Sequence, residues 1–337
     1  MFQNILTKLL NKENLTQAET ESVFNSLMSG ELSPVQISAF LTALAAKGEV
    51  TDEVAGAAKI MRQKSNQINP SVDKLIDTCG TGGDKLGTFN ISTTVGFVVA
   101  AGGLAVAKHG NRSITSKSGG ADVLEALGVK IDLEPVKVEK CIEKIGIGFM
   151  FAPLFHPATK FAMPIRQELK IKTIFNLLGP LTNPANSHYQ LLGVFSPDLT
   201  EKFAGVLREL GIEKALVVHG GGLDEITLTG ETQVSELNKG QIKTYKINPE
   251  DFGLNKCSIE DLKGGDADEN KEILINILKG EEKGAKREIV LLNAGAAFYA
   301  GKIVESIEEG IKLAEEVIDS GKAMRKLEEM VEVTNGI

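Results

Sequence analysis

The residues best suited to chemistry lie in three glycine-rich segments, each of which follows a short apolar run. The first segment is residues 77–84 (DTCGTGGD), between the apolar pair 75–76, which predicts the end of a strand, and residues 90–94, which predict the start of a helix. Glycines let backbone N–H groups approach a phosphate closely, and the helix dipole favours an anion there. The segment therefore predicts a phosphate site, and the carboxylate of Asp84 favours a metal ion or a sugar hydroxyl beside it.

Neither of two common nucleotide-binding motifs is present in this segment. Gly82 and Gly87 have the separation of a Walker A loop, but Thr88 stands where that loop has its lysine. Lys85 occupies the place of the third glycine of a dinucleotide fingerprint. Because a glycine-rich turn by itself is most often only a turn, the phosphate hypothesis needs support from elsewhere in the chain.

A second strand–loop–helix unit gives that support. The predicted strand 104–107 runs into a loop, residues 108–120, that is dense in Lys, Arg, Asn and hydroxyl side chains, and a predicted helix over 121–127 follows. The alternative interpretation is a solvated basic loop. Consecutive β–α units place their loops at one edge of an open α/β sheet, where ligands bind. We therefore expect the two loops to form one site for a polyanionic ligand.

The third segment adds two carboxylates. The predicted strand 215–219 continues into three glycines, Leu223, Asp224 and Glu225. Adjacent acids after glycines usually form a solvent-exposed turn. They also suit Mg²⁺, which takes one or two carboxylates together with substrate phosphates. We expect Asp224 and Glu225 to hold Mg²⁺, with the hydroxyl of Ser92 as a further ligand.

Taken together, these motifs resemble the anthranilate phosphoribosyltransferase family. The matching motifs, in chain order, are residues 80–84, 90–93, 108–112, 121–128, 151–153, 156–158, 164–166, 173–184 and 224–225. The resemblance implies transfer of the phosphoribosyl group of 5-phosphoribosyl 1-pyrophosphate (PRPP) to the amine of anthranilate. The products would be N-(5-phosphoribosyl)anthranilate and pyrophosphate, in the second step from chorismate in tryptophan biosynthesis.

The resemblance also implies roles for single residues. Positions that match the PRPP site are Gly80, Gly83, Asp84, Thr88, Asn90, Ile91, Ser92, Thr93, Lys108, His109, Gly110, Asn111, Arg112, Ser113, Ile114, Thr115, Ser116 and Gly120. Positions that match the anthranilate site are Gly80, Asn111 and Arg166, and the magnesium positions are Ser92, Asp224 and Glu225. Because an aromatic amine is already neutral at pH 7, no essential base is expected. His109 is expected to position substrate, and His156 to form a pocket wall.

The sequence departs from the family at four positions. The family usually has Ser where this chain has Gly120, so only a backbone N–H is left for that contact with the donor. Thr159 stands in place of the usual Met, and Lys170 and Lys172 replace the usual glycine and arginine. These last three changes lie outside the phosphate loops.

The rest of the chain must position these loops. Residues 1–68 predict a helical unit, with caps at Thr16 and at Ser33, which Pro34 follows. From residue 70 onward, helices alternate with predicted strands at 75–78, 104–107, 148–151, 215–218 and 289–293. Further strands with turns are expected over 227–247, and a solvated surface helix and loop over 261–286.

That alternation predicts an α/β fold. We expect a small N-terminal helical domain and a larger α/β domain with a largely parallel central sheet, as in nucleoside phosphorylases and phosphoribosyltransferases. The helical domain is predicted as 1–68, joined by a segment near 164–184, and the α/β domain as 70–163 and 185–337. By resemblance, the protein is expected to be a homodimer through the helical domain.

The composition narrows the function classes. The formal net charge of −8 without a basic stripe argues against a nucleic-acid partner. No apolar stretch reaches membrane-spanning length, residues 1–10 lack a signal-like apolar region, and the three cysteines show no metal spacing, so a cytoplasmic location is expected.

Two alternatives stay open. One is a nucleoside phosphorylase-like enzyme, which uses free phosphate and does not need the acid pair 224–225. The other is a non-catalytic nucleic-acid-binding relative, which should have lost the loops or acids and gained a basic face.

Overall fold

The computed structural model describes residues 1–83, 86–113 and 117–337 of the chain. The ligand roles expected of Asp84, Ile114, Thr115 and Ser116 therefore lie outside the described residues.

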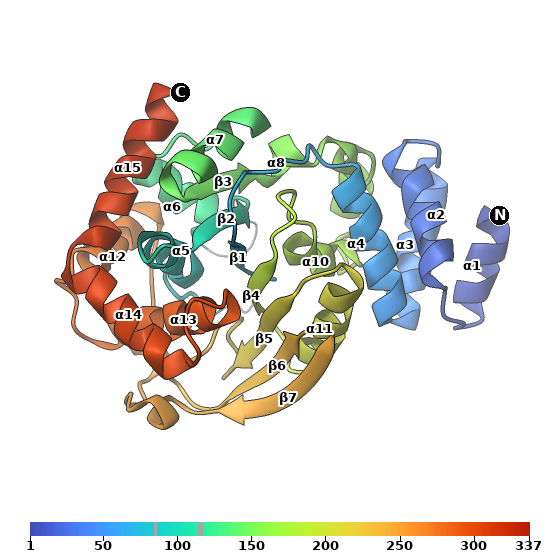
Figure 1. Ribbon diagram of the computed structural model, residues 1–337. Helices are drawn as coiled ribbons and strands as arrows, with labels where there is room; N and C mark the ends of the chain where they lie inside the picture. The colour runs from blue at the N-terminus through green and yellow to red at the C-terminus, as the bar shows by residue number, and fades with distance from the viewer. Residues whose placement is uncertain (84–85, 114–116) are drawn as a thin grey trace.

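Four helices open the chain and lie side by side at one end of the molecule (Figure 1): α1 (Phe2–Leu10), α2 (Gln17–Met28), α3 (Pro34–Lys47) and α4 (Thr51–Gln63). The expected caps are confirmed. Thr16 and Glu19 form a capping box at the start of α2, and Ser33 forms one with Gln36 at the start of α3, where Pro34 is the first residue. Each cap supplies hydrogen-bond partners for N–H groups that the first helical turn leaves without an acceptor.

A seven-stranded sheet forms the centre of the molecule. Its strands, in spatial order, are β3 (Ile147–Phe151), β2 (Ala105–Gly110), β1 (Leu75–Gly80), β4 (Tyr189–Gly193), β5 (Lys214–Gly220), β6 (Thr232–Asn238) and β7 (Gln241–Ile247). The first five strands are parallel, β6 is antiparallel to β5, and β7 is antiparallel to β6. The expected fold class, a small helical unit beside an α/β unit with a largely parallel sheet, is confirmed.

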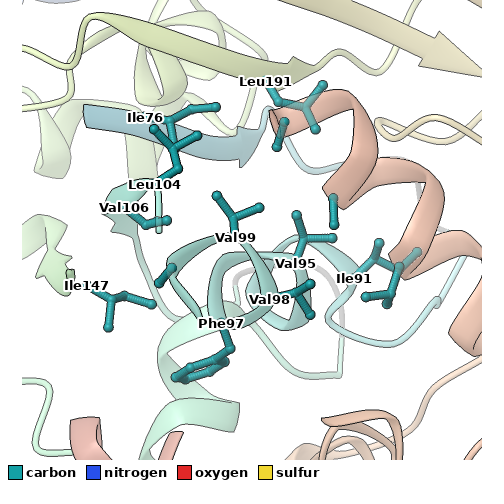
Figure 2. Packing of buried hydrophobic residues seen from close by; sticks show 14 of the residues in the cluster. Ile76, Ile91, Val95, Phe97, Val98, Val99, Leu104, Val106, Ile147 and Leu191 are labelled. Atoms are coloured by element: carbon teal, nitrogen blue, oxygen red, sulfur yellow. The ribbon is translucent and has the colours of Figure 1, made fainter. Parts of the chain in front are cut away.

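Helices cover both faces of the sheet (Figure 1). The helix α5 (Ile91–Ala101) packs against β1 and β2, and α13 (Ala285–Ala300) lies beside it over β4 and β5. Figure 2 shows Val95 and Val99 of α5 facing Ile76 of β1. On the opposite face, α11 (Leu199–Glu209) packs on β5 and β6 and also contacts α4.

The remaining elements are short or peripheral. They are α6 (Gly120–Ala126), α7 (Pro135–Ile145), α8 (Ala152–Phe155), η1 (Pro157–Phe161), α9 (Met163–Leu169), α10 (Phe175–Leu178), η2 (Gly179–Leu181), η3 (Pro249–Phe252), η4 (Ile259–Leu262), α12 (Ala267–Leu278), α14 (Ile307–Asp319) and α15 (Lys322–Gly336).

Successive residues of β5 belong to two different hydrophobic clusters. Leu216 and Val218 pack with α5 and α13, whereas Ala215 and Val217 pack in the cluster that contains the four N-terminal helices. This follows from the alternation of side chains along a strand. The second cluster also contains Leu178 and Leu181, so the helical unit is completed by residues far from it in sequence.

One predicted strand is wrong and one strand was missed. Residues 289–293 lie inside α13, which is buried on nearly every side, so its apolar run lacks the polar face that marks a helix at the surface. The missing strand is β4, which lies between β1 and β5 and is buried along its whole length. The surface helix expected within 261–286 is α12, and it buries Leu274 and Ile277 on one side.

Within the described residues, no helix is both long enough and apolar enough to cross a membrane.

Candidate functional site

The glycine loop after β1 is tied to the neighbouring strands. The N–H of Thr81 donates to the carbonyl of Gly193 at 2.9 Å, and the hydroxyl of Thr81 accepts from the N–H of Phe195 at 3.1 Å. Gly82 and Gly83 have φ values of +65° and +83°, a left-handed conformation that favours glycine. Residues 80–83 are therefore held by contacts to the end of β4 and by the conformation of their glycines.

The expected acid pair reaches this loop. Asp224 follows β5, and its Oδ2 accepts from the N–H of Gly82 at 2.7 Å, across the end of β4. This approach depends on two glycines. A Cβ at Gly80 would lie 2.2 Å from Oδ2 of Asp224, and a Cβ at Gly193 would lie 1.5 Å from its carbonyl oxygen. The first and third motifs of the sequence thus form one site.

A buried lysine lies at the base of the same site. The Nζ of Lys108 donates to the carbonyl of Thr78 at 2.7 Å and to Oγ of Ser92 at 3.2 Å. Burial lowers the pKa of Lys108, while the negative charges of Asp77 and Glu225 act to raise it. Lys108 thus brings a positive charge next to the start of α5, where an anion is already favoured.

Asn90, at the start of α5, connects the two loops. Its side-chain amide donates to the carbonyl of Ser118 at 3.2 Å, and its Oδ1 accepts from Asn270 of α12 at 2.9 Å. The preceding segment is held by a bridge between Thr88 and Lys263. Asn90 and Thr88 therefore fix the loops from within.

The second loop is closed by an aspartate that the sequence analysis did not single out. Oδ2 of Asp122 accepts from the N–H groups of Ser113 at 3.0 Å and Gly119 at 2.8 Å. Asp122 is the third residue of α6 after its cap Gly119, which is the acidic position of a capping box, and that spacing could have identified it. Gly120 is the first residue of α6, so the cap is Gly119.

Arg112 is engaged away from the loop centre. Its guanidinium forms a two-pronged ion pair with Glu125, with 2.7 Å between Nη2 and Oε1, and lies 5.7 Å from the ring centre of Phe151. The side chain is half exposed, so this pair stabilises the loop only modestly.

A cavity of about 550 Å³ opens beside the glycine loop. Its lining joins both units of the molecule and comprises Met61, Cys79, Gly80, Thr81, His109, Gly110, Asn111, Ala152, Pro153, His156, Thr159, Met163, Arg166, Phe175, Asn176, Leu178, Gly179, Pro180 and Thr182. The three residues expected to hold the acceptor, Gly80, Asn111 and Arg166, all line it. The volume is that of a small-molecule site.

Arg166 lies in the wall of this cavity. Its guanidinium is 5.1 Å from the ring centre of Phe175, and partial burial lowers its pKa. Among the described residues, no carboxylate pairs with it within salt-bridge distance. An arginine fork in this setting matches a carboxylate ligand.

Two histidines stand edge to face in the wall, with ring centres 5.0 Å apart. Nδ1 of His109 donates to the carbonyl of Gly179 at 3.2 Å, because a carbonyl can only accept. Burial, together with neighbouring positive groups, lowers the pKa of His109 to about 3, and burial lowers that of His156 to about 4. Both rings are therefore neutral at pH 7, in agreement with positioning roles.

The other expected site residues are distributed as follows. Ser92 and Thr93 lie in the first turn of α5, Gly83 lies in the loop that follows β1, and Gly110 is the last residue of β2. Ile91 is different, since its side chain is buried in the core and its N–H donates to the carbonyl of Phe89.

The donor set suits magnesium. Asp224 and Glu225 supply carboxylate oxygens, and the hydroxyl of Ser92 keeps a lone pair beyond the one that accepts from Lys108. No cluster of three or more His, Cys, Asp or Glu side chains is found in the described parts of the chain. A hard cation with few protein ligands and several substrate oxygens fits this set, whereas a closed structural zinc site does not.

Two family models match the chain. The "Glycosyl transferase family, helical bundle domain" matches residues 3–65, and the "Glycosyl transferase family, a/b domain" matches residues 72–324.

Individual relatives agree with the family models. The anthranilate phosphoribosyltransferase of Acetivibrio thermocellus is 57% identical over 99% of this chain and 97% of that protein. The crystal structure of the enzyme from Thermus thermophilus has a TM-score of 0.93 at 45% identity, covering 98% of this chain and 99% of the other. The enzyme from Saccharomyces cerevisiae, solved in complex with PRPP and Mg, has a TM-score of 0.90 at 28% identity over 100% of this chain and 98% of its own. By fold, site and similarity, the chain belongs to the anthranilate phosphoribosyltransferases of the glycosyl transferase family.

Proposed function

We propose that this protein transfers the phosphoribosyl group of PRPP to the amine of anthranilate, giving N-(5-phosphoribosyl)anthranilate and pyrophosphate. One observation carries the proposal. An acid pair touches a glycine-rich anion loop through Asp224 and Gly82, and a cavity opens beside that loop, lined by an arginine that has no acid partner among the described residues. The site thus offers one place for a polyanion with its cation and another for a small aromatic acid.

On the donor side, backbone groups hold the charge of PRPP. In this proposal the loop from Gly80 to Gly83 and the first turn of α5, with Asn90, Ser92 and Thr93, bind the phosphates through N–H groups and hydroxyls. The second loop, from Lys108 to Ser113, binds from the other side, with Gly120 offering an N–H at the start of α6. Preorganised donors stabilise the negative charge that develops on the leaving pyrophosphate.

Mg²⁺ is the proposed cofactor, held by Asp224, Glu225 and Ser92. When bound, it supplies positive charge to the pyrophosphate oxygens. The yeast relative contains Mg in its complex with PRPP. Gly80 and Gly193 keep Asp224 close to the glycine loop, so the chain itself sets where the carboxylates stand.

On the acceptor side, the cavity orients anthranilate. Arg166 pairs with the carboxylate, while Asn111 and the backbone at Gly80 lie between the acceptor and the donor loop. The yeast relative has been solved with 4-fluoroanthranilate. The amine forms a bond to the anomeric carbon without prior deprotonation while the C–O bond to pyrophosphate breaks, and the proton that the amine then loses passes to pyrophosphate or water. The neutral rings of His109 and His156 add no charge to the wall beside that of Arg166. Orienting the two substrates supplies a large share of the rate.

A homodimer through the helical domain is part of the proposal. Leu10 of α1 and Val35 of α3 expose 70% and 78% of their surface, so both apolar side chains are accessible to a partner subunit. The division into a helical domain, 1–68 with 164–184, and an α/β domain, 70–163 with 185–337, stays a prediction.

The decisive experiment mixes the protein with PRPP, Mg²⁺ and anthranilate and follows the loss of anthranilate fluorescence. We expect loss only with all three components present, and pyrophosphate should appear in equal amount. Pyrophosphate is measured separately, because a nucleoside phosphorylase-like activity would instead require a nucleoside and free phosphate. If fluorescence stays constant with all components present, the proposed reaction is wrong.

A further inference from the structure

The segment 179–182 forms part of the cavity wall, and buried side chains hold its carbonyl groups one after another. The carbonyl of Gly179 accepts from His109 at 3.2 Å, that of Pro180 from Nε2 of Gln190 at 2.6 Å, and that of Leu181 from Nε of Arg62 at 2.8 Å. His156 lies beside the fourth carbonyl, that of Thr182, which acts to raise the pKa of its ring.

These three donors and His156 come from different parts of the fold. Arg62 belongs to α4 of the helical unit, His109 to β2, Gln190 to β4, and His156 follows α8. All four are buried; Gln190 is 0% exposed and Arg62 is 7% exposed. Four elements thus converge on four consecutive peptide groups.

Within the part of the chain that the structure describes, one polar atom of each of these four side chains is buried without a hydrogen-bond partner. These atoms are Nη2 of Arg62, Nε2 of His109, Nε2 of His156 and Oε1 of Gln190, half of all such buried atoms found in the described chain. A buried polar atom without a partner destabilises a fold, so such atoms call for an explanation. The orientation of each side chain is set by the carbonyl it meets.

The site explains why the carbonyls need these donors. Gly179, Pro180 and Thr182 line the acceptor cavity. Buried donors bind the carbonyls of Gly179, Pro180 and Leu181. A wall held at three successive carbonyl groups keeps its distance from an aromatic ring constant.

We propose that Arg62 and Gln190 are positioning residues for the acceptor, an inference that rests on the proposed function. They contact no substrate themselves. They hold the wall 179–182, and the wall sets how tightly and how selectively the aromatic acceptor binds.

The first test is Gln190→Leu, which removes the donor to Pro180 together with the unpartnered Oε1 while keeping similar volume. We expect the KM for anthranilate to rise about tenfold, in line with one lost hydrogen bond, and the KM for PRPP to change less than about twofold. Discrimination against 4-methylanthranilate should weaken, because the wall can move. Arg62→Met should act in the same direction, and Arg62→Lys should restore part of the loss because its ammonium can still donate to Leu181.

Ser187→Ala is the matched control. Ser187 is 2% exposed, lies near β4 and has a hydroxyl without a partner, but it does not bond to the wall. Its kinetics should equal those of the unchanged protein, and thermal melts accompany every variant. The proposal is wrong if Gln190→Leu leaves acceptor KM and selectivity unchanged, or if both KM values rise together with a fall in melting temperature. Failure of the proposed function is separate, since the unchanged protein would then not consume anthranilate.

Discussion

The two sides of the site are built in opposite ways, and two consecutive residues of β2 mark the border. Lys108 lies on the face of α5 and donates to Ser92, whereas His109 lies on the other face and donates to Gly179. On the donor side, loops with glycines at positive φ present backbone N–H groups. On the acceptor side, buried side chains fix a short wall.

The difference follows from the ligands. A polyanion is held by charge, which acts over several ångströms and tolerates small displacements of a loop. An uncharged aromatic ring is held by contact, which a shift of a fraction of an ångström already weakens. We therefore expect changes on the donor side to be severe only where charge is removed, and changes on the acceptor side to be severe where position is lost.

The largest effect is expected from the acid pair. Asp224→Asn with Glu225→Gln should lower kcat by about 10²–10³, comparable to the loss of a strong electrostatic contact in a transition state. The melting temperature should change little, because both acids lie in a loop at the sheet edge. Steady-state kinetics with varied Mg²⁺ and a thermal melt measure both. Full activity of the double variant in EDTA would remove these acids from the metal site.

The acceptor side is tested through Arg166. Arg166→Ala should weaken the binding of anthranilate by about 1.5–3 kcal/mol, as for the loss of a charge-assisted hydrogen bond, and its KM should rise accordingly. The KM for PRPP should stay nearly unchanged. Arg166→Lys should recover only part, because an ammonium cannot bind a carboxylate with two parallel hydrogen bonds. Each substrate is varied in turn. A parallel rise of both KM values with a lower melting temperature would make Arg166 structural.

The neutral histidines predict how stability depends on pH. Their folded pKa values, about 3 for His109 and about 4 for His156, lie below the unfolded value, so the unfolded chain binds protons first as the pH falls. Above pH ~6.5 the two histidines contribute their full stabilisation. Between pH 7 and pH 5, each of them should lower the free energy of unfolding by about 2 kcal/mol.

The surrounding charges modify this slope. The positive charges of Arg62 and Lys108 lower the pKa of His109 and so make stability depend more strongly on pH. Asp77 acts in the opposite sense, because burial raises its pKa and its folded form holds a proton more readily than its unfolded form. His156→Asn isolates the histidine, since Asn removes the titrating ring and keeps a polar side chain at this position. Denaturant titrations at pH 7 and pH 5 should show a smaller difference for this variant, and an equal difference contradicts the assignment.

The smallest effect is expected at Gly120. A Cβ there would lie 3.3 Å from Oγ1 of Thr93, and the residue does not have a positive φ. Gly120→Ser should therefore change the KM for PRPP by less than about tenfold, or ~1.4 kcal/mol. Stability should shift by only a few tenths of a kcal/mol, the range seen at helix starts. A larger loss in donor kinetics would show that Thr93 cannot move aside.

The meeting of the glycine loop and the acid pair at one edge of the sheet could be predicted from the sequence, whereas the acceptor wall could not, for a physical reason. Loops such as 80–84 carry their function in glycines and in the residues directly beside them, so a local pattern is enough. Arg62 and Gln190 bind carbonyl groups of the wall 179–182, and the carbonyl that Arg62 binds is more than a hundred positions away from it in the chain. No local sequence pattern therefore identifies these two residues.

The fold shows the same contrast. Caps at Thr16 and Ser33 are local and were predicted, whereas the strand at 289–293 was wrong because a fully buried helix has no polar face. The buried strand β4 was missed, because an apolar run between loops lacks the alternation of apolar and polar residues that predicts a strand.

The discontinuous core of the helical unit has a consequence for synthesis. The cluster that buries Phe24 and Phe40 also needs Leu178, Phe203 and Leu237. Translation proceeds at about 5–20 residues per second. The last residues of this cluster are therefore synthesised on the order of ten seconds or more after the first four helices. Over that interval their apolar faces are open to chaperones, and the nascent chain cannot close this core one domain at a time.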